Sequence, residues 1–180
     1  MAWIEVEAKI KVKDHNLINS KLKKIAKFIK KEIKDDSYYT LENFKKIYPK
    51  KSLRIRKKGK QRIVNFKQWI SYNNGIHVKK ETEFTVSDVK KFLSLLKDFG
   101  FKKWISKHKE CTVYQYKKTS IELNKVKKLG WFLEVEYLCN KKEIPKAKKQ
   151  IKAVIKLLKI KNDNVEKSGY TKLLYDLKKK

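Results

Sequence analysis

The chain has 180 residues, 41% hydrophobic and 12% aromatic, so it can bury one sizeable core and is not a disordered protein. Lys and Arg number 49 against 19 Asp and Glu, and the formal charge of +30 predicts attraction to polyanions such as nucleic acid, anionic membranes or small phosphates. Nearly all of these bases are Lys, which a compositional bias on solvated faces also explains, so the few Arg are more informative.

The sequence carries no signal for a membrane or for an oxidising compartment. Charges appear by Glu5, and no apolar run reaches the length of a membrane-spanning helix. Cys111 and Cys139 lie far apart in apolar segments, which indicates small buried side chains rather than a zinc site or a disulfide. We therefore expect a soluble, cytoplasmic protein with no membrane partner.

Alternation of charged and apolar residues predicts strands along most of the chain. The pattern is clearest in WIEVEAKIKV, where Glu5, Glu7 and Lys9 share one face and aliphatic residues share the other. Gly-containing turns separate several later segments and favour hairpins. The predicted strands are 3–12, 35–44 (a strand with a loop), 53–57, 61–69, about 76–86, 103–117, 120–126 and 131–138.

Helical periodicity predicts three or four helices between these strands, each with an apolar stripe that needs a partner surface. Strands in hairpin order with helices inserted between them predict an antiparallel α+β fold, in one domain covering residues 1–180. The predicted helices run from an Asp14 N-cap to about Ile33, from a Ser87 N-cap to Gly100, over 144–160, and around 170–177.

The charged faces of the strands combine acids and bases in a pattern that recurs across the chain. Arg54 and Arg56 share a face in LRIRK, as Glu134 and Glu136 do in GWFLEVEYL. If helices cover the apolar outside of a closed barrel, these faces line a wet interior that holds charged ligands. The alternative is an open sheet with its charged face in water, and periodicity alone does not separate the two. The other strands contribute Asn65, Lys67, Lys79, Glu81, Glu83, Lys107, Lys109, Glu122 and Asn124.

EVEAK at residues 5–9 matches the Glu-X-Glu-X-Lys signature of the CYTH superfamily, also called triphosphate tunnel metalloenzymes. The blocks LRIR, NFKQ, KKETEF, LGWFLEVE and SGYTKLL follow in the family's order over essentially the whole chain. FLSLLKDFGFKKWISKHKECTVY and SGYTKLL resemble the CyaB-type class IV adenylate cyclases in particular. The resemblance implies a closed eight-stranded antiparallel β-barrel with helices packed outside, binding a triphosphate together with Mg²⁺ or Mn²⁺.

The resemblance also implies roles for individual residues, and their chemistry suits those roles. Carboxylate oxygens are preferred ligands of Mg²⁺, whereas Arg grips phosphate with two hydrogen bonds and Lys acts as a point charge. The metal-binding residues would be Glu5, Glu7, Glu134 and Glu136, with Glu81, Glu83 and Asn124 completing the acidic lining. The phosphates would be held by Lys9, Arg54, Arg56, Lys67, Lys107 and Lys109, of which Lys9, Lys107 and Lys109 would be catalytic.

Three departures from the family pattern bear on activity. Asn124 stands where the family usually has Asp, and loss of that carboxylate is expected to weaken metal binding or to change which metal fits. Lys109 stands where the family usually has Arg, and Lys79 or Lys80 replaces another Arg; both changes keep the charge but lose the two-pronged phosphate contact.

The implied function is a metal-dependent cyclase that converts ATP to 3′,5′-cyclic AMP and pyrophosphate. A triphosphatase acting on thiamine triphosphate, inorganic triphosphate or a nucleotide is the alternative. A non-enzymatic nucleic-acid or polyanion binder does not explain paired acids on three strands, which would repel a polyanion. The expected partner is therefore ATP or another triphosphate, with a homodimer left open.

Histidine and tyrosine residues add little to this assignment. His15, His77 and His108 lack the spacing of metal ligands and are expected to be structural or surface residues. The pair Tyr38 and Tyr39 is expected to pack within a strand. For Tyr170, packing and contact with a ligand at the tunnel mouth are equally compatible with the sequence.

Overall fold

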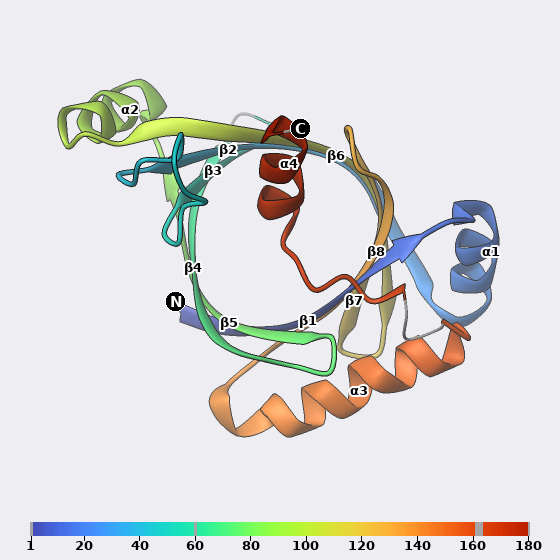
Figure 1. The fold of residues 1–180 in the computed structure, drawn as a ribbon. Helices are drawn as coiled ribbons and strands as arrows, with labels where there is room; N and C mark the ends of the chain where they lie inside the picture. Colours follow the sequence, from blue (N-terminus) through green and yellow to red (C-terminus); the bar gives the residue numbers. More distant parts are fainter. Residues whose placement is uncertain (1, 60, 161–163, 180) are drawn as a thin grey trace.

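The structure is a computed structural model that describes residues 2–59, 61–160 and 164–179. Eight antiparallel strands close into a barrel in the order β1-β5-β4-β3-β2-β6-β7-β8, seen end-on in Figure 1. The predicted fold class is confirmed. The strands are β1 (Ala2–Val12), β2 (Lys27–Thr40), β3 (Leu53–Lys58), β4 (Gln61–Asn73), β5 (Ile76–Val86), β6 (Lys102–Tyr116), β7 (Thr119–Val126) and β8 (Gly130–Cys139).

Side-chain alternation divides each strand between the outer core and the barrel interior. On β1, Val6 and Ala8 are buried in the main hydrophobic cluster outside the barrel. Glu7 and Lys9 point inward, and their cross-strand partners on β8 are Glu136 and Glu134. The strand pairing therefore brings charged residues from the two ends of the sequence together inside one barrel.

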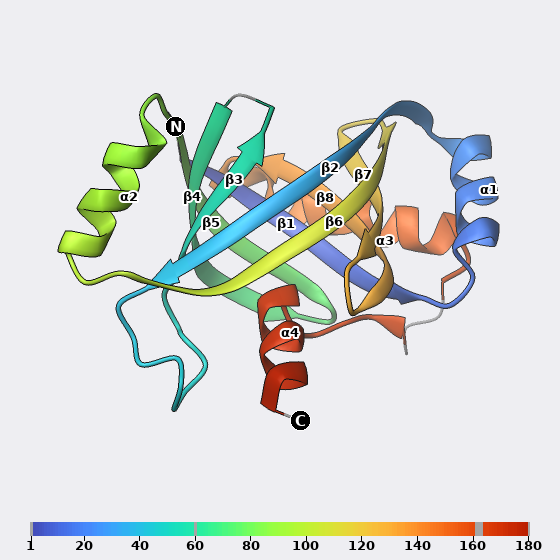
Figure 2. The ribbon, with the colours of Figure 1, turned by 90° about the horizontal axis from the view of Figure 1, so that it is seen from above.

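Four α-helices and one short 3-10 helix accompany the barrel among the described residues. Helix α3 packs outside on β1 and β8, where Ala147, Ile151 and Val154 are fully buried. Burial of Ile151 and of Val154 stabilises the fold by roughly 1.5–3 kcal/mol each, and burial of the smaller Ala147 contributes less. Figures 1 and 2 show α4 lying across one end of the barrel. The helices are α1 (His15–Ile25), α2 (Val89–Asp98), η1 (Lys141–Glu143), α3 (Ile144–Leu157) and α4 (Tyr170–Lys179).

The predicted first helix is too long. Helix α1 ends at Ile25, Ala26 is extended, and residues 27–33, expected to be helical, begin β2. The strand pairs with β6 almost from end to end, and this ladder of hydrogen bonds overrides the local helical spacing of apolar residues. The predicted N-cap Ser87 is also wrong by one residue, because the side chain of Asp88 accepts the hydrogen bond from the Lys91 N–H.

The cysteine and histidine predictions are confirmed. Cys111 and Cys139 are buried free thiols. His15 stacks on Trp131, with ring centroids 4.0 Å apart. His108 lies on the exterior, with Nδ1 2.7 Å from an Asp35 oxygen. None of the described helices has the length and apolar character needed to cross a membrane.

Candidate functional site

The barrel interior is a cavity of about 1180 Å³ lined by side chains from all eight strands. Twelve of the thirteen predicted site residues line it directly, so the open-sheet alternative is wrong. The thirteenth, Asn124, is buried behind the lining and contacts Glu134. The lining members are Glu5, Glu7, Lys9, Arg54, Arg56, Lys67, Glu81, Glu83, Lys107, Lys109, Glu134 and Glu136.

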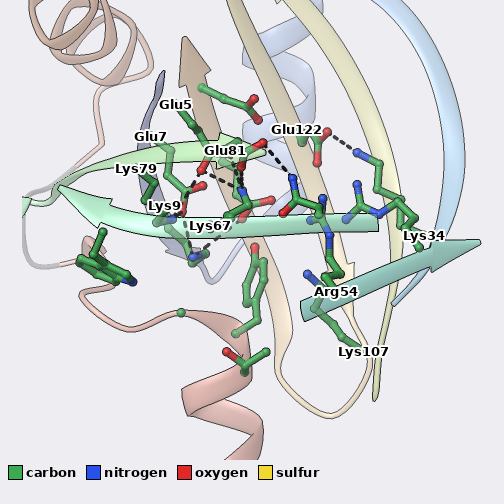
Figure 3. A pocket seen from close by; sticks show the side chains of 18 of the residues that line it. Glu5, Glu7, Lys9, Lys34, Arg54, Lys67, Lys79, Glu81, Lys107 and Glu122 are labelled. Atoms are coloured by element: carbon green, nitrogen blue, oxygen red, sulfur yellow. Dashed lines mark hydrogen bonds and ion pairs between the residues drawn. The ribbon is translucent and has the colours of Figure 1, made fainter. Parts of the chain in front are cut away.

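Acids and bases are unevenly distributed around this interior. Carboxylates outnumber bases on the neighbouring strands β7, β8 and β1, whereas bases predominate on β4, β3 and β6. The intervening strands β5 and β2 carry charges of both signs. Figure 3 shows Glu5, Glu7 and Lys9 on one side of the cavity and Arg54 and Lys107 on the other. A ligand that combines a cation with a polyanion is complementary to such a polarised interior.

Lysines hold the two acids of β1. Lys67 donates to both oxygens of Glu5 at 2.7 and 2.8 Å, and it also pairs with Glu81. Lys79 donates to Glu7 at 3.0 Å, and Lys9 to the same oxygen at 3.3 Å. Although burial opposes ionisation, Lys79 and Lys9 hold the pKa of Glu7 well below its usual value. Glu7 therefore remains a carboxylate at any working pH.

A second cluster surrounds Glu134. Lys109 donates to Glu122 at 2.8 Å and to Glu134 at 2.7 Å, while Lys34 reaches Glu122 at 2.5 Å. The Asn124 amide donates to Glu134 at 2.7 Å. An Asp at position 124 could not make this donation while ionised, and it would place a third carboxylate beside Glu122 and Glu134. The cluster is thus satisfied with an amide at that position.

Asp36 is a central site residue that the sequence reasoning missed. It accepts two hydrogen bonds from Arg56, at 2.6 and 2.9 Å, and pairs with Lys107 at 3.0 Å, with no solvent exposure of its side chain. Burial alone would raise the pKa of Asp36, but Lys107 and Arg56 outweigh it and hold that pKa far below its usual value. Asp36 lies inside the predicted strand 35–44, but the helical prediction for residues 27–33 hides its alternation with Glu32 and Lys34 along β2, which marks this inward face.

Glu136 is the acid most suited to a metal ion. It makes no ion pair with any residue that the structure describes, although it lies opposite Glu7 across β1 and β8. Burial, and then the charge of Glu5, raise the pKa of Glu136 well above its usual value. Facing carboxylates destabilise a strand pair unless a cation lies between them, and hard oxygen ligands suit Mg²⁺ and Mn²⁺. The donor set therefore fits a divalent cation.

The described carboxylates are not already arranged as a metal-binding site. Within residues 2–59, 61–160 and 164–179, no three His, Cys, Asp or Glu side chains converge on one point as metal ligands. Lysine ammonium groups lie between the carboxylates instead, as Lys79 does between Glu5 and Glu7. A cation entering here must displace at least one lysine, and a phosphate is a suitable new partner for that lysine.

A profile of the CYTH domain matches residues 3–170, nearly the whole chain. The chain belongs to the CYTH family. A CYTH-family relative from Methanocaldococcus jannaschii, named "Putative adenylate cyclase MJ0240", is 29% identical over 94% of this chain and 98% of its own. The solved structure of the PH1819 protein from Pyrococcus horikoshii is 30% identical, covers 98% of this chain and 99% of its own, and superposes with a TM-score of 0.79.

One more distant structure extends the comparison of the CYTH barrel. A Hippeastrum protein, described as revealing a dominant triphosphatase activity, superposes with a TM-score of 0.64 over 93% of this chain and 91% of its own. Its sequence identity is 16%, so this likeness shows a common fold and nothing finer. The family resemblance drawn from the EVEAK signature is confirmed, while the roles of individual residues remain predictions.

Proposed function

We propose that this CYTH protein is a metal-dependent enzyme acting on a triphosphate inside its barrel, and specifically a class IV adenylate cyclase. The observation that carries the proposal is the closed interior with carboxylates on β1, β7 and β8 facing bases on β3, β4 and β6. We also place the enzyme in the cytoplasm, in keeping with the free, buried thiols of Cys111 and Cys139.

The basic arc would bind the triphosphate of ATP. Arg54 and Arg56 can each grip a phosphate with two hydrogen bonds, and Lys107 and Lys109 supply point charges beside them. A divalent cation held by Glu5, Glu7 and Glu136 would, when bound, neutralise charge on the phosphate oxygens. Together these residues would hold the triphosphate chain inside the barrel while the ribose hydroxyl reacts.

In the cyclase reaction the oxygen of the ribose 3′-hydroxyl forms a bond to the α-phosphorus and gives up its proton to solvent. The bond from that phosphorus to the bridging oxygen breaks, and pyrophosphate leaves with the electron pair. Lysine and arginine side chains around the leaving group stabilise its developing negative charge, which is the main catalytic contribution a protein makes to phosphoryl chemistry. The 29% identical relative bearing an adenylate cyclase name supports this choice.

Hydrolysis of a triphosphate is the second candidate, because the same interior can present a terminal phosphorus to water. The triphosphatase activity attributed to the Hippeastrum protein, which has the same fold, favours keeping it. The two reactions differ only in which phosphorus faces the nucleophile, and Arg54, Arg56 and Lys109 serve both.

Product analysis tests the proposal. The purified protein is incubated with ATP, inorganic triphosphate and thiamine triphosphate, each with Mg²⁺ or Mn²⁺ and again with EDTA. Cyclic AMP plus pyrophosphate supports the cyclase, orthophosphate supports the triphosphatase, and both should vanish in EDTA.

A matched pair of variants tests whether turnover depends on the residues inside the barrel. Glu136→Gln should lower turnover by at least about 100-fold, since it removes a carboxylate from the proposed metal site. Glu110→Gln, an exposed acid on β6, should leave turnover unchanged. Metal-independent activity, or equal activity in both variants, would contradict the assignment.

A further inference from the structure

Tyr170 lies at the meeting point of the three lysines that the sequence marks as catalytic. It is the first residue of α4 and lines the cavity with only 5% of its surface exposed. The ammonium nitrogens of Lys9, Lys107 and Lys109 lie 4.4, 5.2 and 5.8 Å from the centroid of its ring. Two of these lysines come from β6 and one from β1, so the ring joins two separate walls of the barrel.

Apolar packing explains why Tyr170 is buried, but it does not explain why three lysine ammonium groups lie close to its ring. The ring meets Phe132 edge-on at 5.1 Å and belongs to a small apolar cluster with Val126. Three ammonium groups within 6 Å of one point repel one another, and each has its own carboxylate partners in other directions. The negative face of an aromatic ring attracts cations and is worth most where water is excluded.

The Tyr170 hydroxyl is buried, and its polar neighbour is the side chain of Asn124. Replacing Tyr170 by Phe removes this contact with Asn124 but keeps the ring beside the lysines, so the substitution separates the effect of the ring from that of the hydroxyl.

We propose that Tyr170 is a positioning residue whose ring gathers Lys9, Lys107 and Lys109 into one anion-binding cluster at the end of the barrel closed by α4. This rests on the proposed triphosphate function, which it extends by giving the C-terminal helix a direct part in substrate binding. The cluster suits a compact, multiply charged phosphate chain, because three ammonium groups then share one ligand.

The test measures binding of inorganic tripolyphosphate by calorimetry, in EDTA so that no turnover occurs and again with Mg²⁺. Tyr170→Phe keeps the ring and should bind within about threefold of the wild type. Tyr170→Leu keeps an apolar side chain but loses the ring, and it should bind about tenfold more weakly. Circular dichroism and thermal midpoints establish that both variants are folded.

Tyr175→Leu is the matched control for loss of packing. Tyr175 lies in the same helix, is buried to a similar degree and does not itself line the cavity. It packs on Trp104, which does not line the cavity either, and on Tyr48, which does. Its replacement should lower the thermal midpoint and leave tripolyphosphate affinity within threefold of the wild type. Equal weakening in Tyr175→Leu and Tyr170→Leu would assign the effect to helix packing and overturn the proposal.

Several other results would also overturn it. Wild-type affinity in Tyr170→Leu, or a Tyr170→Phe as weak as Tyr170→Leu, would show that the ring does not position the lysines. A wild-type protein that fails to bind tripolyphosphate under either condition would refute the proposed function itself and the inference with it. Binding by the wild type without a difference among the variants would refute the inference alone.

Discussion

Replacing Asp36 by Asn should make the protein less stable and, at the same time, a better binder of polyphosphate. The Asp36 carboxylate is fully shielded from water and neutralises both Arg56 and Lys107. Removing one member of a buried ion pair leaves an uncompensated charge, and Asp36→Asn should cost about 3 kcal/mol of unfolding free energy. For a chain of this size that corresponds to a thermal midpoint lower by roughly 6–12 °C.

The gain in binding follows from the same geometry. With an uncharged Asn at position 36, no carboxylate neutralises Arg56 and Lys107. The net charge of the barrel interior therefore rises by one positive unit. One unit charge about 6–8 Å from a phosphate at an effective dielectric constant near 20 is worth roughly 2 kcal/mol per unit of ligand charge. After losses to competing contacts, we expect tripolyphosphate to bind about tenfold more tightly.

Chemical denaturation and calorimetric titration measure the two effects in one pair of variants. Asp35→Asn is the control, because Asp35 adjoins Asp36 in sequence but points outward, with 55% of its side chain exposed. It should change stability by no more than about 0.5 kcal/mol and leave tripolyphosphate affinity unchanged. An Asp36→Asn variant as stable as the wild type, or one that binds tripolyphosphate more weakly, would refute the reasoning.

Three further predictions concern stability. The pKa of Asp36 is depressed in the folded state, so the ionised Asp36 stabilises the fold at pH values above its unfolded-state pKa of about 3.9. This stabilisation is lost as the pH falls further. The difference in unfolding free energy between wild type and Asp36→Asn should therefore narrow in thermal melts below about pH 4. Gly75→Ala should lower the unfolding free energy in urea melts by about 1–3 kcal/mol more than Gly59→Ala does. Both glycines have a positive φ, but a Cβ added at position 75 would collide with the Val165 side chain, whereas one added at position 59 meets nothing within 4 Å. Equal losses in the two variants would contradict the close approach of Val165 to Gly75. Ile151→Ala should cost about 2–5 kcal/mol, because the side chain is fully buried between α3 and the barrel, and a cost below 1 kcal/mol would argue against that packing.

Much of the barrel interior was predictable because charged and apolar residues alternate along the strands. Glu5, Glu7 and Lys9 share one face of β1, and aliphatic residues share the other face. The same alternation places Arg54 and Arg56 on one face of β3. A charged face repeated on nearly every strand, together with helices that need apolar partners, is compatible with few architectures. The family signature then separated the closed barrel from the open sheet.

Residues whose position depends on pairing between distant strands were harder to predict. The stretch from Phe28 to Ile33 has apolar spacing that suits a helix, and no Gly or Pro marks the end of α1. Only the long ladder to β6 makes it a strand, so the alternation of Glu32, Lys34 and Asp36 on one face is not apparent from the sequence. Likewise, the lack of an ion pair between Glu136 and any lysine that the structure describes depends on cross-strand register, which the sequence does not contain.

A crystal grown with Mn²⁺ and tripolyphosphate, measured at the manganese absorption edge, tests the central claim most directly. We expect an anomalous peak inside the barrel beside Glu136, with phosphate density between that peak and the guanidinium groups of Arg54 and Arg56. Manganese and phosphate bound only on the lysine-rich exterior, with the interior ion pairs intact, would contradict it.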